Sequence, residues 1–228
     1  ESFVWQTSWG VSWRLIGGMI MVHGDDKGLV LPPRVAPIQV VIIPIYRSNE
    51  EKNMVLEKSR EIKQELDNRK IRAHLDDRDQ VTPGFKFNDW EMKGVPIRIE
   101  LGPKDLEHDK VVFVRRHNQL KQEYPINIVV EIIIKELEKI HNDMFSDAQK
   151  ILDERTVTLE TYDDFKSQLE KGMLIKAPIC DNPSCEEKIK EETGADIRVI
   201  PDGCDDNDSK CIYCGGQSKI RPLFARGY

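Results

Sequence analysis

Residues 38–46 read IQVVIIPIY, and this nearly continuous apolar run decides the fold of the segment around it. A strand with one face in water alternates apolar and polar residues, whereas a strand covered on both faces is apolar throughout. The run therefore predicts a central strand with other parts of the chain packed on both of its faces.

A helix is predicted directly after this strand. Ser48 and Glu51 form the S-x-x-E pattern of a capping box, in which each side chain binds a free backbone N–H of the first turn. Val55, Ile62 and Leu66 follow at helical spacing, so they share one face of the helix. That face is expected to pack on the central strand.

Strands and helices continue to alternate up to residue 140. Residues 96–101, PIRIEL, alternate apolar and polar side chains, as a strand does. The other expected elements are strands at 71–75 and 111–116, a helix from Pro83, and a long helix from residue 126 that continues beyond Met144. This order predicts an α/β fold with a small mixed sheet flanked by helices.

The C-terminal part predicts a second, α+β domain. A helical connector is expected to run to about residue 170, and a strand then ends at Cys180. A charged helix begins near Cys185 and ends at Gly194, a residue favoured at helix C-caps. A strand at 195–200, an acidic loop at 201–210 and the sequence CIYCGG at 211–216 follow.

The composition excludes several classes of protein. Of 228 residues, 39% are hydrophobic and 32% are charged, which is typical of a folded domain. The longest apolar stretch, 15–22, is shorter than the roughly 20 residues of a membrane span, and no signal peptide is visible. We therefore expect a cytoplasmic protein without membrane contact. The net charge of −6 disfavours non-specific coating of nucleic acid but permits a local RNA site.

Cations interleave with acids between residues 72 and 121. Balanced charge of this kind is typical of a solvated surface, and only the fold decides which cations share a face. The cations are Arg78, Lys86, Lys93, Arg98, Lys104, Arg115 and Arg116.

Four of the five cysteines have the spacing of a metal site. Cys180 and Cys185 form a C-x4-C pair, and Cys211 and Cys214 form a C-x2-C pair followed by two glycines. Zinc takes four thiolates tetrahedrally, and four protein ligands leave no position for a substrate, so the pattern predicts a structural zinc ion. Two alternatives stay open: unrelated reduced thiols, or Cys204 in place of one ligand.

The first 37 residues carry a motif of another kind, and up to about residue 36 a strand and turn followed by a packed apolar helix are expected. Residues 4–37 read VWQTSWGVSWRLIGGMIMVHGDDKGLVLPPRVAP, where Arg14 precedes a glycine pair, an apolar run and HGDD. This order resembles the third signature motif of class II aminoacyl-tRNA synthetases, in the form carried by prolyl-tRNA synthetases of the archaeal and eukaryotic type. In that family the motif closes the catalytic domain, so the resemblance implies the back half of an enzyme.

Two further signatures resemble the same family. Residues 76–78, 82–87, 91–96 and 100–103 are similar to the anticodon-binding domain of class II synthetases, and the paired cysteines with the terminal Tyr228 are similar to the family's zinc-binding C-terminal domain. The resemblance implies three parts. These are the end of a class II catalytic domain at 1–36, an anticodon-binding domain at 37–140 and a zinc-binding domain at 141–228. The cysteine pairs and GLVLPPRVAP disfavour a threonyl or glycyl synthetase.

The resemblance also implies roles for individual residues. It implies a buried Arg14 that binds ATP, and it makes the loop from His23 to Asp26 a structural link, rather than a metal or acid–base site. The implied sets are Gln6, Ser12 and Arg14 for ATP, Ser8, Trp9 and Gly10 for proline, and Arg78, Lys86, Phe87, Trp90 and Lys93 for the anticodon. For Phe85, Phe87 and Trp90 a place in the core is the alternative.

The implied reaction is activation of L-proline by ATP, with Mg²⁺, and transfer of proline to tRNA(Pro) by a homodimeric enzyme. The first two class II motifs do not occur in this sequence, so we expect that these 228 residues do not aminoacylate alone. The alternative is a non-catalytic RNA-binding or regulatory module built on an anticodon-binding domain.

Overall fold

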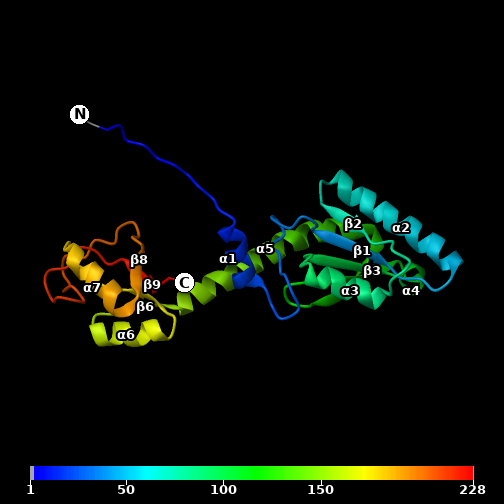
Figure 1. Cartoon of the computed structure of the whole chain (residues 1–228). Coiled ribbons are helices and arrows are strands. Elements are labelled where there is room, and N and C mark those ends of the chain that lie inside the picture. The colour runs from blue at the N-terminus through cyan, green and yellow to red at the C-terminus, as the bar shows by residue number, and fades with distance from the viewer. Residues whose placement is uncertain (1–2, 228) are drawn as a thin grey trace. The chain divides into compact units, whose positions relative to one another are not determined.

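The structure is a computed structural model that describes residues 3–227 and separates into two compact units, Glu1–Ala148 and Gln149–Tyr228 (Figure 1). The boundary falls inside helix α5 (Val129–Glu154), as does residue 140, where the sequence places the end of the anticodon-binding domain. Each unit contains its own sheet. None of the helices in the described part of the chain has the length and apolar character of a membrane span.

The sheet of the first unit is mixed, as the sequence predicts. Its strand order is β2-β1-β3-β4-β5, with β1 parallel to β2 and β3, and with β4 antiparallel to β3 and β5. The strands are β1 (Val40–Pro44), β2 (Ala73–Leu75), β3 (Ile97–Leu101), β4 (Lys110–Arg115) and β5 (Lys121–Pro125). All five residues of β1 are buried, which confirms its central place. The edge strand β5 was not predicted, because KQEYP is polar and mostly exposed.

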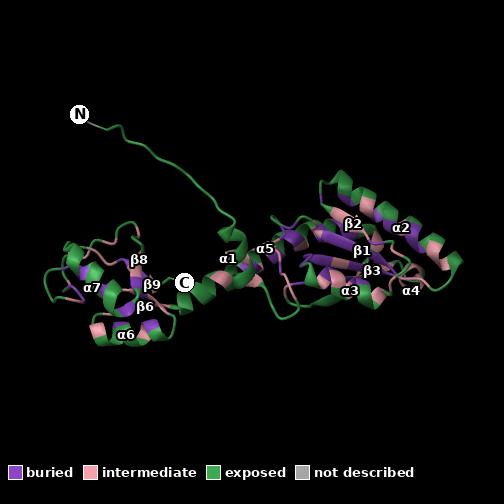
Figure 2. Ribbon diagram, viewed as in Figure 1, coloured by how far each residue is buried: buried purple, intermediate pink, exposed green. Residues whose placement is uncertain are grey.

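Helices cover both faces of this sheet (Figure 2). Helix α2 (Asn49–Asn68) and α5 pack on one face, where Leu66 and Ile133 join the same core as the strands. Helix α3 (Pro83–Met92) packs on the other face, where Trp90 meets Val41 and Ile43 of β1. The short helices α4 (Pro103–Glu107) and η1 (Ile126–Ile128) complete the unit.

The predicted capping box begins α2. Ser48 Oγ accepts a hydrogen bond from the backbone N–H of Glu51 at 3.2 Å, and Glu51 Oε2 accepts one from the N–H of Ser48 at 3.3 Å. Val55, Ile62 and Leu66 are buried, as their helical spacing predicts. The start of this helix is therefore specified locally.

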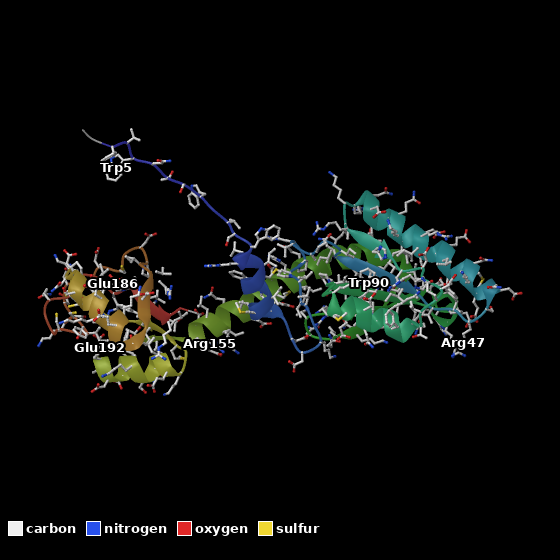
Figure 3. All side chains as sticks on the ribbon, viewed as in Figure 1. Trp5, Arg47, Trp90, Arg155, Glu186 and Glu192 are labelled. Carbon is white, nitrogen blue, oxygen red and sulfur yellow. The ribbon has the colours of Figure 1, made fainter. Side chains whose placement is uncertain are left out.

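The N-terminal segment differs from its prediction. Residues 3–12 form no regular structure, and helix α1 (Arg14–His23) is exposed over most of its length. Arg14 is exposed instead of buried, and Trp5, labelled in Figure 3, is fully exposed. A strand needs a neighbouring strand to satisfy its backbone groups, and the described residues supply none beside this segment.

The second unit has a four-stranded sheet in the order β6-β7-β9-β8. Its strands are β6 (Thr156–Thr158), β7 (Leu174–Lys176), β8 (Ala195–Val199) and β9 (Leu223–Arg226), and its helices are α6 (Tyr162–Glu170) and α7 (Pro183–Thr193). Strand β6 interrupts the continuous connector expected up to residue 170. The β-branched sequence Thr156-Val157-Thr158 favours a strand over a helix there. Gly194 ends α7 at φ 71°, as its predicted cap role requires.

Candidate nucleic-acid interface and metal centre

Asp76 is the centre of a buried polar network beneath α3. Its carboxylate accepts hydrogen bonds from Arg78 Nε at 2.8 Å, Arg78 Nη2 at 2.7 Å and Trp90 Nε1 at 2.7 Å. Lys86 Nζ donates to the Asp76 carbonyl at 2.9 Å. Burial alone would raise the Asp76 pKa, but the Arg78 and Trp90 hydrogen bonds and the Lys86 charge together hold that pKa well below its ordinary value.

Most of the residues implied for the anticodon belong to this network. Lys86 and Trp90 are buried, with 3% and 7% exposure, so they position the network and offer little surface to a base. Figure 3 shows Trp90 on α3. Phe87 is half-buried and Phe85 is 53% exposed. Of the three aromatic residues, Trp90 takes the core place that helical spacing allows.

Arg78 and Lys93 extend the network to the surface through Asp89. Arg78 Nη2 lies 2.8 Å and Lys93 Nζ lies 3.0 Å from Asp89 Oδ2. The Lys93 side chain is 49% exposed and its ammonium lies 4.5 Å from the centre of the Trp90 ring. Lys93 and Arg78 are therefore the accessible cations of the predicted set.

A second polar group lies on the same side of the sheet as α3, and we call it the open sheet face: Phe87, Arg98, Glu100 and Lys121. Glu100 binds both cations, with Arg98 Nη2 at 2.9 Å and Lys121 Nζ at 3.0 Å. The Phe87 ring centre lies 4.5 Å from the Arg98 guanidinium. Two cations share one carboxylate here, so one positive charge is left over beside an aromatic ring.

Sequence reasoning did not assign Arg98, Glu100 and Lys121 to a site. A signal was present for two of them, because PIRIEL places Arg98 and Glu100 on the strand face opposite Ile97 and Ile99. Lys121 had no such signal. Its place follows from the pairing of Val114 with Lys121 across β4 and β5.

The residues implied for ATP and proline all lie in the exposed N-terminal segment. Gln6, Ser8, Trp9, Gly10, Ser12 and Arg14 are exposed. Ser12 Oγ accepts a hydrogen bond from the Arg14 backbone N–H at 3.4 Å. The described part of the chain therefore presents these side chains to solvent.

The structure brings together the four cysteines that the sequence predicts as metal ligands. Their sulfur atoms all lie within 4.8 Å of one another. The Cys180–Cys185 and Cys180–Cys214 sulfur atoms are 3.5 and 3.8 Å apart. A tetrahedral zinc ion at its usual bond length to sulfur separates its ligands by about 3.8 Å, so the donor set and its spacing are compatible with zinc.

The turn from Cys211 to Gly216 has the features of a metal knuckle. Cys211 N–H donates to the Gly216 carbonyl at 2.7 Å, and Gly216 N–H donates to Cys214 Sγ at 3.4 Å. A Cβ on Gly216 would lie 3.3 Å from that sulfur. Burial opposes ionisation of Cys211, yet the backbone N–H groups of Cys214, Cys180 and Tyr213 lower its pKa to about 7. Burial instead raises the pKa values of Cys180 and Cys185, so the thiols of the cluster do not share one tendency to ionise.

Cys204 lies outside this cluster, which contains only the two predicted pairs among the described residues. Cys204 is half-buried and lies in the acidic loop, where its backbone carbonyl accepts a hydrogen bond from the Arg221 N–H at 2.8 Å. Tyr228, which the resemblance matches to the family's terminal residue, lies outside the described residues.

Two family models match the chain. An anticodon binding domain matches residues 39–136, and "Prolyl-tRNA synthetase, C-terminal" matches residues 162–228. The first match covers the mixed sheet with the Asp76 network and the open sheet face, and the second covers the four cysteines.

The curated proteins that are similar to this chain are named proline–tRNA ligases. A proline–tRNA ligase of Cenarchaeum symbiosum is 51% identical over 228 residues, which are 100% of this chain and 48% of that protein. A proline–tRNA ligase of Natranaerobius thermophilus is 48% identical over 231 residues, with 100% of this chain and 47% of the relative covered. Proline–tRNA ligase 2 of Clostridioides difficile is 45% identical over 225 residues, with 98% and 46% covered.

The chain thus spans about half the length of the curated relatives it matches. The matched anticodon domain and the matched C-terminal domain follow one another in a single chain. The chain belongs to the prolyl-tRNA synthetase family, and it corresponds to a C-terminal region of that family's longer members.

Proposed function

We propose that this chain is the tRNA-binding, zinc-binding part of a proline–tRNA ligase, which forms prolyl-adenylate from L-proline and ATP and transfers proline to tRNA(Pro). The observation that carries the proposal is a matched anticodon binding domain in which the sheet supplies cations beside an aromatic ring of α3. The relatives' shared name supplies the reaction. The longer enzyme is expected to be a cytoplasmic homodimer.

The open sheet face is the proposed contact for anticodon bases. Single-stranded bases are recognised by stacking on aromatic or guanidinium planes and by hydrogen bonds to their edges. Phe87, which is half-buried, and Arg98, whose side chain is 17% exposed, provide both kinds of plane, and Lys121, which is 61% exposed, provides a cation for the phosphates. Guanine suits this surface, because arginine donates well to its acceptor edge.

The predicted anticodon residues take two roles in this proposal. Arg78 and Lys93 border the α3 surface and contact the RNA backbone electrostatically, while Phe87 contacts a base. Lys86 and Trp90 hold Asp76 and so keep α3 in place, because both are buried and hydrogen-bonded to that residue.

The exposed N-terminal residues complete an active site in the longer enzyme. We assign ATP contacts to Gln6, Ser12 and Arg14, and proline-pocket contacts to Ser8, Trp9 and Gly10. The guanidinium of Arg14 can form bidentate hydrogen bonds with a phosphate or stack on adenine. Catalysis there depends on positioning and charge stabilisation, with Mg²⁺ on the ATP phosphates. The 228 residues alone leave this segment open to solvent and are expected not to aminoacylate.

The cysteine cluster is proposed to hold one structural Zn²⁺ through Cys180, Cys185, Cys211 and Cys214. The ion would join α7 to the knuckle and stabilise a unit whose apolar core is small. The four sulfur positions support this assignment.

Binding of a tRNA(Pro) anticodon stem–loop to the purified chain tests the RNA part of the proposal. Fluorescence anisotropy should show binding that weakens with salt, and that weakens further when guanine bases of the anticodon are changed to adenine. Equal affinity for both RNAs would contradict the proposed base contacts. Elemental analysis of the same protein should find one zinc per chain.

A further inference from the structure

The two cysteine pairs belong to different parts of the second unit, and Glu192 and Tyr213 connect those parts. Cys185 lies in the first turn of α7, and Glu192 lies near the end of the same helix. Tyr213 lies inside the knuckle, between Cys211 and Cys214, and its hydroxyl donates to Glu192 Oε1 at 2.7 Å. Figure 3 shows Glu192 on α7. One hydrogen bond therefore joins the helix of one pair to the turn of the other.

The Glu192 carboxylate is held from its other side as well. Tyr162, at the start of α6, donates to Glu192 Oε2 at 2.9 Å, so each carboxylate oxygen has its own hydroxyl donor. The Tyr162 and Tyr213 rings meet edge to face with their centres 5.2 Å apart. Tyr162 in turn stacks on the buried Phe165, with centres 5.8 Å apart. These contacts fix Glu192 in one orientation.

We propose that Tyr213 and Glu192 are positioning residues for the metal: their hydrogen bond holds Cys211 and Cys214 at the correct distance from Cys185 before an ion binds. This inference rests on the proposed zinc site. A preformed site loses less chain freedom when it binds, and partners outside the ligand shell strengthen metal binding in this way. No ligand of the cluster changes in the variants below, so their effect reports on positioning alone.

Tyr213→Phe tests the proposal, and Tyr162→Phe is its matched control. Both variants remove one tyrosine hydroxyl from the same carboxylate, but α6 carries no cysteine, so only the first variant cuts the link between the two pairs. We expect zinc affinity, measured by competition with a chromophoric chelator, to fall about tenfold in Tyr213→Phe, the lower end of the effect of such partners. We expect a change of less than about twofold in Tyr162→Phe, because the link itself remains.

Thiol alkylation of the zinc-loaded chain, followed by mass spectrometry, gives a reading at each cysteine. In Tyr213→Phe, the alkylation rates of Cys211 and Cys214 should rise more, relative to the wild type, than the rate of Cys180. Glu192→Ala should reproduce this pattern. The Tyr213→Phe/Glu192→Ala double variant should bind zinc no more weakly than Glu192→Ala alone, because both changes remove the same hydrogen bond. Circular dichroism checks that each variant is folded. Glu192→Gln, which keeps an acceptor oxygen for the Tyr213 hydroxyl, should retain zinc affinity close to that of the wild type. If Glu192→Ala unfolds, Tyr213→Phe remains the variant that removes the hydrogen bond.

The outcomes separate this inference from the zinc proposal. Equal zinc affinity and alkylation rates in Tyr213→Phe and the wild type would overturn the positioning role and leave the zinc site standing. Equal losses in Tyr213→Phe and Tyr162→Phe would also overturn it, since general packing would then explain both. A wild-type chain that binds no zinc would overturn both proposals.

Discussion

Arg116 binds Asp25 with two parallel hydrogen bonds, Nη1 to Oδ2 at 2.7 Å and Nη2 to Oδ1 at 2.6 Å, across 91 residues of sequence. The same guanidinium donates from Nε to the Glu91 carbonyl at 2.8 Å. Arg116, which follows β4, thus connects the turn after α1 with the end of α3 through hydrogen bonds. Asp25 belongs to the HGDD loop, for which the family resemblance implies a structural role, and its contact with Arg116 is structural.

Removal of this contact should destabilise the first unit. The Arg116 side chain is 3% exposed and its partner Asp25 is 43% exposed, so Arg116→Ala is expected to cost about 2 kcal/mol of unfolding free energy, the range of hydrogen bonds to charged groups. Urea denaturation measures the change. Arg34→Ala is the control, because the exposed Arg34–Glu138 pair should contribute less than about 1 kcal/mol. Similar losses in both variants would contradict the structural role of Arg116.

The Asp25–Arg116 contact should also make stability depend on pH. The Arg116 hydrogen bond lowers the Asp25 pKa from 3.8 to about 2. A carboxyl with a lower pKa in the folded state stabilises the protein above its unfolded pKa, and this stabilisation is lost as the pH falls through the folded value. We expect unfolding free energy to drop between about pH 5 and pH 2, with a smaller drop in Asp25→Asn. Identical pH profiles for the two proteins would refute the assignment.

Asp76 should be far more important for stability than its neighbour Asp77. Asp76→Asn removes a buried negative charge. The ammonium group of Lys86, which is 3% exposed and lies 3.9 Å from the Asp76 carboxylate, then loses its nearest partner of opposite charge. The expected cost is about 3 kcal/mol or more, as for a broken buried ion pair. Asp77→Asn, at an exposed position, should change stability by less than about 0.5 kcal/mol. Thermal melts of both variants would decide, and equal melting temperatures would rule out the buried network as a source of stability.

Arg98→Ala should weaken binding of the tRNA(Pro) anticodon stem–loop by about 1–3 kcal/mol, because it removes the guanidinium beside Phe87. Lys58→Ala is the control. It also removes one positive charge, but from α2, on the opposite face of the sheet. Lys58→Ala is therefore expected to leave affinity nearly unchanged. A loss of the same size in both variants would show that net charge, not the open sheet face, determines binding.

Loss of one proposed zinc ligand should unfold the second unit without unfolding the first. Cys211→Ser is expected to abolish stoichiometric zinc and to expose the amides of residues 173–226 to hydrogen exchange, because the ion joins α7 to the knuckle. The five-stranded sheet should stay protected. Cys204→Ser is the control, since Cys204 lies outside the cluster, and it should keep full zinc content. Full zinc content in Cys211→Ser would exclude the four-thiolate site.

Local rules account for the elements that the sequence predicts. The apolar run of β1, the capping box of α2 and the Gly194 cap all depend on residues close together in the chain. Strands β5 and β9 were missed because neither has a strong local pattern: KQEYP is polar, and LFAR is four residues long and becomes an inner strand only through its pairing with β7 and β8. The exposed N-terminal segment departs from its prediction for a related reason, since a strand requires a partner.

By itself, the sequence determined the mixed α/β character, the two cysteine pairs and the family resemblance, because these depend on spacing and order along the chain. Only the tertiary structure decided which charges are buried. Lys86, Arg115 and Arg116 look like parts of a solvated surface in sequence, yet each is at most 4% exposed and has an acidic partner brought close by the fold. The tertiary structure also placed Lys121 beside Arg98 and closed the two cysteine pairs into one cluster. The physical reason is common to these cases: a charge or a thiol acquires its role from neighbours that are distant in sequence.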